Sequence, residues 1–174
     1  CDPRKEAVAL GQTYFAIQTR KQELIEEEYN NLSEDKKRLK IRKQTRTGNL
    51  ALNKTAVNAG VKNLDKFHNA GYKGLYNGES ANDIAKRKGL RYREDILDNM
   101  GSDELIANLF RISQTNQKLI NDKIKGELNS CNTHYIVGKN IRDVIKKNGG
   151  TMPEDLPNPN KSIKEIKDKR KNYL

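Results

Sequence analysis

The stretch GSDELIANLFRISQTNQKL, residues 101–119, carries the clearest helix signal in the chain. Gly101 and Ser102 open it, and Asp103 and Glu104 follow at the positive end of the helix dipole. Its apolar residues then recur at three- and four-residue spacings, which places them on one helix face. They are Leu105, Ile106, Leu109, Phe110, Ile112 and Leu119. The segment therefore predicts an amphipathic helix that must pack against a second apolar face.

The same spacing recurs on both sides of this segment. It predicts further helices over about residues 3–29, 33–60, 63–69, 81–88, 92–99 and 133–148. No run of alternating β-branched residues predicts a strand, so the expected fold class is all-α, an irregular assembly of several helices. Tyr14 and Phe15 are expected to share one core with Leu105, Leu109 and Phe110, because these are the bulkiest residues on the two most apolar faces.

Two polar or glycine-rich stretches predict connections between these helices. GYKGLYNG, residues 71–78, is expected to be a turn-rich segment, and residues 129–132 a polar loop. Further on, Pro153, Pro157 and Pro159 predict an extended linker. A last capping box then opens a basic terminal helix. We therefore expect a helical domain over residues 1–150, followed by a proline-containing linker and terminal helix over residues 151–174.

The composition limits the class of protein. Hydrophobic residues make up 34% of the chain and charged residues 33%, with a net charge of +11. Such a chain builds a thin core and exposes much of its helices. No apolar run is long enough to span a membrane, no segment resembles a signal peptide, and two cysteines form no disulfide framework. These features predict a cytoplasmic protein with no membrane contact. Because the first methionine is Met100, we also expect the chain to be a fragment or a processed product.

Positive charge is concentrated in one run. From Lys36 to Leu64 the chain has nine basic residues and no acidic one. Such a run favours phosphate-rich polymers or acidic protein surfaces, although a solvated helix face is the commoner explanation for any single run. Seven members surround about three helical turns, and we expect this half of the helix to stand in solvent. These candidate binding residues are Lys36, Lys37, Arg38, Lys40, Arg42, Lys43 and Arg46.

Two smaller basic sets are further candidates. Lys139, Arg142 and Lys146 recur at three- and four-residue spacing on one side of the helix expected from residue 133, whose first N–H groups could meet an anion. Arg87 and Lys88, together with Lys86, Arg91 and Arg93, form a candidate phosphate-contact patch. They lie in a segment that resembles a helix-turn-helix only weakly, because its register slips by one residue. No alternation of aromatic and basic residues predicts a base-stacking platform.

The catalytic inventory is poor. His68 and His134 are the only histidines, and neither lies in a metal-binding or triad motif. An enzyme centred on Cys131 and His134 stays open as an alternative. We expect a binding protein without catalytic residues, metal or cofactor.

Several segments resemble one family, the bacterial DNA-damage-inducible protein D. The matching pieces occur in the family's order and span nearly the whole chain. They are GQTYFAIQTRKQEL (11–24), GYKGLYNG (71–78), RKGL (87–90), ILDNMGSDELIANLFRISQT (96–115) and GGTMPEDLP (149–157).

The resemblance implies a protein induced in the SOS response. The family is associated with restraining the RecA recombinase by acting on its filaments on single-stranded DNA and blocking strand exchange. RecA filaments and single-stranded DNA are therefore the expected partners. Members usually begin with a domain similar to the amino-terminal region of baculovirus repeat proteins, so this chain is expected to be the carboxy-terminal part. An alternative is a DNA-binding regulator in which this part forms homo-oligomers or binds nucleic acid non-specifically.

Overall fold

The computed structural model describes residue 17 and residues 33–172, and every regular element in residues 33–172 is helical. The α-helices are α2 (Glu34–Asn58), α3 (Leu64–Leu75), α4 (Ala81–Arg87), α5 (Ser102–Asn121), α6 (Glu127–Lys147) and α7 (Ile163–Lys171). Two short 3₁₀ turns, η1 (Leu97–Asn99) and η2 (Pro153–Asp155), lie in the connections. The all-α prediction is confirmed for this part of the chain.

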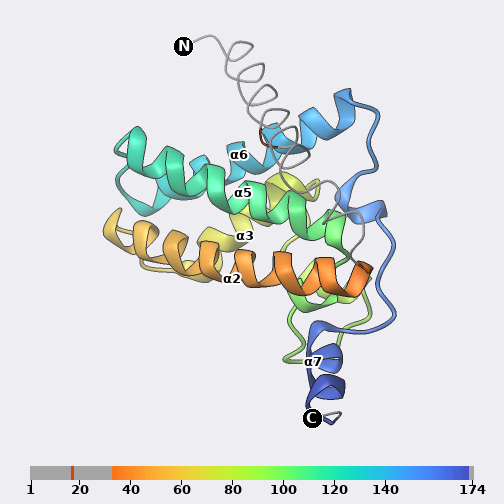
Figure 1. Ribbon diagram of the computed structural model, residues 1–174. Coiled ribbons are helices and arrows are strands. Elements are labelled where there is room, and N and C mark those ends of the chain that lie inside the picture. The colour runs from red at the N-terminus through yellow and green to blue at the C-terminus, as the bar shows by residue number, and fades with distance from the viewer. Residues whose placement is uncertain (1–16, 18–32, 173–174) are drawn as a thin grey trace.

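The four long helices pack in pairs. α2 lies along α5, α3 lies along α6, and α5 also contacts α6 (Figure 1). Ser33 caps α2, and Ser80 and Asp83 form a capping box at the start of α4. These caps satisfy backbone N–H groups that have no partner inside a helix.

Two apolar clusters form the core. One contains Leu105 and Phe110, with Leu109 packed partly buried against it. The other gathers Leu52, Phe67 and Ile112, among others, from α2, α3 and α5. The predicted shared core is thus confirmed for Leu105, Leu109 and Phe110. The predicted contribution of residues 14 and 15 lies outside the described residues.

A buried polar layer lies among these apolar residues. The Arg111 guanidinium meets the Nε2 atom of His134 and donates to the Asn108 amide oxygen over 3.1 Å. It also lies 4.6 Å from the centre of the Tyr72 ring. His134 Nδ1 is 2.9 Å from the Phe67 carbonyl oxygen, so Nδ1 carries the proton and Nε2 accepts from Arg111. No carboxylate in residues 33–172 pairs with Arg111, so neutral groups, the Tyr72 ring among them, surround this buried charge.

The predicted turn over residues 71–78 is wrong in its first half, because Gly71 and Gly74 lie inside α3. These glycines allow the α3 backbone to touch α6. A Cβ atom on Gly74 would overlap the Tyr135 carbonyl oxygen, and one on Gly138 would lie 2.7 Å from the Gly71 carbonyl oxygen. The glycines therefore serve close helix packing rather than a turn, which begins only after Leu75.

Two further local predictions are wrong. Residues 129–132 belong to α6, which begins after Gly126 at a φ of 90°. Their polarity misled the prediction, since Ser130 faces the interior and Asn129 donates back to the Lys125 carbonyl oxygen. Residues 92–99 form a loop and η1 instead of a helix. There the Asp95 carboxylate accepts from the Leu97 N–H over 2.8 Å, a side-chain bond that competes with helix formation.

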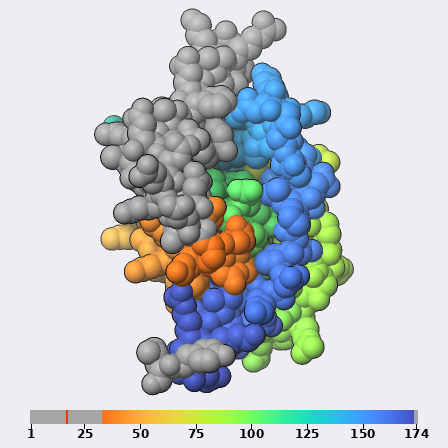
Figure 2. Space-filling view, turned by 45° about the vertical axis from the view of Figure 1, so that its right-hand side comes forward, coloured from red at the N-terminus to blue at the C-terminus, as the bar shows by residue number. Residues whose placement is uncertain are grey.

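The proline-containing segment packs against the helices. Pro153 is buried at the start of η2, and Ile163 and Ile166 are the buried residues of α7. α7 lies next to the first turns of α2 (Figure 2). Within residues 33–172, no helix is both long and apolar enough to cross a bilayer.

Candidate nucleic-acid interface

The structure sorts the basic residues of α2 into two faces. The inward face holds Arg38, Ile41, Thr45, Leu52 and Ala56. The expectation that the first half of this helix stands in solvent is therefore wrong for its inward face. On the outer face, the apolar residues Leu50 and Val57 are 66% and 55% exposed.

Four lysines share the opposite, exposed face. They are Lys36, Lys40, Lys43 and Lys54, which we call the lysine stripe. Lys36 and Lys54 are about five turns apart and point in the same direction, and the other two lie within about 40° of that line. None of the four forms an ion pair with another described residue. Arg46 is also exposed, on the flank of the stripe, whereas Lys37 is half-buried.

Arg38 is a structural residue, contrary to its prediction as a binding residue. It is 0% exposed. Its guanidinium donates to the carbonyl oxygens of Met100 at 2.9 Å, Asp98 at 3.0 Å and Lys161 at 2.8 Å. One side chain thereby joins α2 to the loop before α5 and to the segment before α7.

Arg42 also points toward the protein. It forms ion pairs with Asp98 at 2.7 Å and Asp95 at 3.0 Å, at the base of the loop before α5. A substitution of Arg38 or Arg42 would therefore remove contacts within the protein, and a change in ligand binding could not be separated from a loss of stability.

The predicted pair on α4 is likewise internal. The Arg87 Nε atom lies 2.9 Å from the Glu79 carboxylate, and its Nη1 donates to the Glu154 carbonyl oxygen. Lys88 has a side chain that is 1% exposed and lies 2.9 Å from Glu104. Both residues hold the α4 region together, and the segment after them forms no second helix of a helix-turn-helix.

The set on α6 is divided. Arg142 forms a two-pronged ion pair with Glu154 at 2.6 and 2.7 Å, whereas Lys139 and Lys146 are exposed. The predicted anion site at the start of this helix is wrong, because α6 begins at Glu127. There the Glu127 carboxylate accepts from the Lys62 and Asn63 N–H groups.

The sequence did not identify one exposed aromatic residue, at the tip of the loop after α4. Tyr92 is 91% exposed and stands between Arg91 and Arg93, after Gly89 ends the α4 region. The sequence signal for this residue is the triplet RYR, an aromatic residue between two cations. It was not used because no longer alternation of aromatic and basic residues surrounds it.

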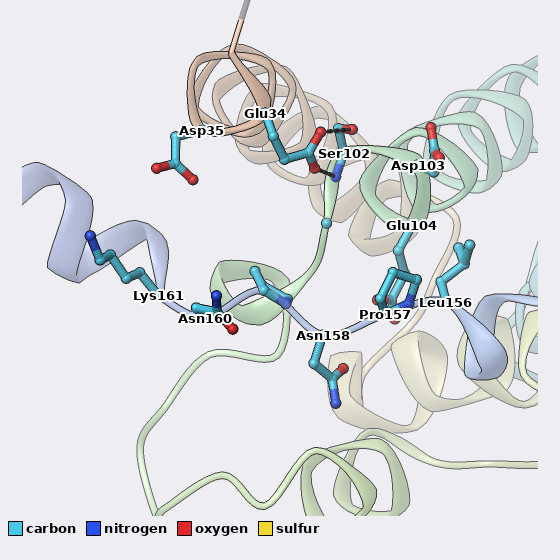
Figure 3. Close-up of a pocket in the computed structure, with 12 residues that line it drawn as sticks. Glu34, Asp35, Ser102, Asp103, Glu104, Leu156, Pro157, Asn158, Asn160 and Lys161 are labelled. Atoms are coloured by element: carbon cyan, nitrogen blue, oxygen red, sulfur yellow. Dashed lines mark hydrogen bonds between the residues drawn. The ribbon is translucent and has the colours of Figure 1, made fainter.

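The pocket near the start of α5 has the opposite charge. It has a volume of about 500 Å³ and lies between the starts of α2 and α5 and the linker. Figure 3 shows the Glu34 carboxylate reaching Ser102, where it accepts from the backbone N–H and the hydroxyl group, both at 2.8 Å. Asp35 and Asp103 add further negative charge to the lining. Phosphate groups would be repelled here, so this pocket does not belong to the basic surface.

A comparison with family profiles matches residues 32–166 to the DinD C-terminal domain. The chain belongs to this family. It is also 47% identical over 169 residues to "DNA damage-inducible protein D" of Escherichia coli (strain K12), an alignment that covers 95% of this chain and 62% of that protein. The chain therefore spans less than two thirds of the length of this relative. No solved structure matches significantly.

The matched range places most of the basic residues inside the DinD C-terminal domain. It begins at residue 32, just before α2, and ends at Ile166 in the middle of α7. The lysine stripe and the Tyr92 loop both fall within it. The last basic residues of α7, from Lys167 onward, lie beyond it.

Cys131 and His134 do not form a nucleophile and base in this DinD C-terminal domain. Both lie on α6 and are buried, and both ring nitrogens of His134 already have partners. Burial raises the pKa of the Cys131 thiol, which disfavours the nucleophilic thiolate. Residues 33–172 also hold no group of three or more side chains suited to a metal ion.

Mild acid is expected to destabilise the DinD C-terminal domain through its histidines. Burial, and then the Arg111 charge, lower the pKa of His68 to about 4 and hold the pKa of His134 well below its usual value. In the unfolded chain both titrate near about 6.5, so their contribution is complete above that pH and is lost as pH falls toward 4. Each histidine should remove up to ~1.4 kcal/mol per pH unit in this window.

Urea unfolding at pH 7, 6 and 5 checks this expectation. His68→Gln keeps an amide donor for the Asn53 side chain, which lies 2.6 Å from His68 Nε2. This variant should lose about half of the pH dependence. A free energy of unfolding that stays constant between pH 6.5 and 5 would contradict the assignment of both histidines as neutral.

Proposed function

We propose that this chain is the carboxy-terminal part of a DNA-damage-induced, non-enzymatic regulator of homologous recombination. It binds the single-stranded DNA of RecA filaments through the lysine stripe and so restrains strand exchange. The name of the E. coli relative supports the link to DNA damage. The observation that carries the DNA contact is the stripe itself, four exposed cations in a line along one helix.

The stripe has the dimensions of a polymer-binding surface. From Lys36 to Lys54 it extends over about 27 Å, at 1.5 Å per residue. The lysines face outward, without carboxylate partners among the described residues, so their charge is available to phosphates. Flexible ammonium groups on an open helix surface suit contacts with the phosphates of a nucleic acid, which carry no information about the base sequence. This arrangement favours affinity for single-stranded DNA of any sequence.

Neutralising three lysines of the stripe tests the proposal. Lys36→Gln, Lys40→Gln and Lys43→Gln together should weaken binding to fluorescein-labelled oligo(dT), measured by anisotropy between 50 and 200 mM NaCl. The slope of log affinity against log salt should flatten by about 0.7 for each lost phosphate contact, or about 2 in all. Because all three side chains are exposed, the melting temperature should be unchanged.

A matched variant removes the same charge elsewhere. Lys139→Gln, Lys146→Gln and Lys147→Gln change three exposed lysines of α6, a helix that packs on α3 and α5. This variant should keep nearly the parent affinity and slope. It should also keep its inhibition of RecA-catalysed strand exchange, which the stripe variant should lose. Equal binding losses in the two variants would show that net charge, rather than the stripe, governs binding.

A further inference from the structure

The Tyr92 side chain is exposed to solvent and is free to contact a ligand, whereas a packing residue would be buried. Its side chain is 91% exposed, the highest value among the large apolar and aromatic residues of the described chain. The Arg93 guanidinium lies 5.6 Å from the centre of its ring. An aromatic face left in water contributes little to folding, because no apolar area is removed from solvent.

The loop that carries Tyr92 is fixed at both ends. On one side, Leu90 packs against the core, and its N–H donates to the Ala85 carbonyl oxygen over 3.0 Å. On the other side, the Glu94 carboxylate accepts from the Arg91 N–H at 2.6 Å, and the Glu94 N–H donates back to the Arg91 carbonyl oxygen at 3.1 Å. The tip is thus a closed turn rather than an open loop.

Arg93 adopts an unfavourable backbone conformation at this tip. Its φ is 75°, in the left-handed region that a residue with a long side chain rarely occupies. Such strain persists where the surrounding structure enforces it and is typical of functional sites. The neighbouring cations Arg87 and Lys88 are paired with acids, whereas Arg91 and Arg93 meet no carboxylate among residues 33–172.

The base of the loop is held against α2, the helix that carries the lysine stripe. Asp95, at the base of the loop, pairs with Arg42, which directly precedes Lys43 on α2. Figure 1 shows the connection between α4 and α5 projecting beyond α2 on the side where α7 lies.

From this arrangement we infer that Tyr92 stacks on an unpaired base of single-stranded DNA, while Arg91 and Arg93 contact the phosphates on either side. The inference rests on the proposed function and adds a base contact to its backbone contacts. Stacking is tolerant of sequence, because every base has an aromatic face. It requires an unstacked base, so the tip selects single strands over duplexes.

A tryptophan substitution gives a direct readout. The chain contains no tryptophan, so Tyr92→Trp introduces the only one, at the position in question. Its fluorescence should be quenched on addition of oligo(dT) to the full chain. A duplex of the same length, or a fully abasic strand with the same number of phosphates, should leave the fluorescence nearly unchanged. Equal signals for oligo(dT) and the abasic strand would overturn the stacking role.

Affinity measurements separate this inference from the proposed function. Tyr92→Ala should weaken oligo(dT) binding by about tenfold, should not change binding to the abasic strand, and should keep the salt slope. Tyr92→Phe should bind like the parent chain, since it keeps the ring. If Tyr92→Ala binds oligo(dT) as tightly as the parent while the stripe variant is weakened, the inference fails and the proposed function stands. If the parent chain binds no single-stranded DNA, both fail.

Discussion

Arg38→Ala is expected to lower the free energy of unfolding by about 3–5 kcal/mol. The Arg38 side chain is fully buried and donates to three backbone carbonyl oxygens, those of Asp98, Met100 and Lys161. Alanine would leave these acceptors without a partner in the protein interior, and an unsatisfied buried polar group costs about 1–3 kcal/mol. The loss should also loosen α7, because the Lys161 carbonyl lies just before it.

Two comparisons sharpen this test. Arg38→Lys should recover only part of the stability, since one ammonium group cannot reproduce the planar fork that reaches three oxygens. Lys40→Ala, two residues away on the exposed face, should stay within about 0.5 kcal/mol of the parent. Urea unfolding followed by circular dichroism measures all three variants. An Arg38→Ala variant as stable as Lys40→Ala would show that the arginine is not the link between these segments.

Gly74→Ala should destabilise the protein by about 3 kcal/mol or more, although alanine is the better helix former. In an exposed helix this exchange would gain about 1 kcal/mol. Here the added Cβ atom overlaps the backbone of Tyr135 on α6, which cannot move aside as a side chain would. The two helices must separate, and α3 and α6 share the most extensive helix–helix contact in the described fold. Overpacking of this kind outweighs the gain in helix propensity.

Gly48→Ala is the matched control for this effect. Gly48 also lies inside a helix, but a Cβ atom there meets only side-chain atoms, Ile112 Cγ2 at 3.1 Å and Leu109 Cδ1 at 3.8 Å. These atoms can shift by a few tenths of an ångström, so the change in stability should be small. Thermal unfolding of both variants gives the comparison. Equal melting temperatures for Gly74→Ala and Gly48→Ala would contradict the close backbone contact.

The sequence predicted those features that depend on neighbours along the chain. The capping box expected before the terminal helix is formed by Ser162, and Ser33 and Ser80 cap helices in the same way, because a cap bonds to a backbone group three residues away. Gly71 and Gly74 were misassigned to a turn. These positions need glycine because the backbone or side chains of α6, more than sixty residues later, lie against them. No local pattern distinguishes a glycine that closes a turn from one that admits another backbone.

The candidate site shows the same limit. Lys36, Lys40 and Lys43 were identified from the charge run, but the run could not reveal that they share a face while Arg38 points inward. The inward face of α2 contains an arginine and a threonine, which hydrophobic periodicity does not mark as inward-facing. Tyr92 was passed over because its exposure depends on how the loop is fixed at both ends.

The polar layer around Arg111 has a consequence for the alignment of the helices. Apolar faces can slide past each other by one turn and still bury a similar area, whereas a buried guanidinium must find its own acceptors. Arg111 can reach His134 in only one alignment of α5 on α6, whereas its bond to the Asn108 amide lies within α5. His134 in turn fixes α3 through the Phe67 carbonyl oxygen. A shift of α5 along α6 by one turn would leave the buried Arg111 charge without its partner on α6, at a cost of several kcal/mol. The layer thus selects a single native alignment, at the expense of the greater stability that an all-apolar interior could provide.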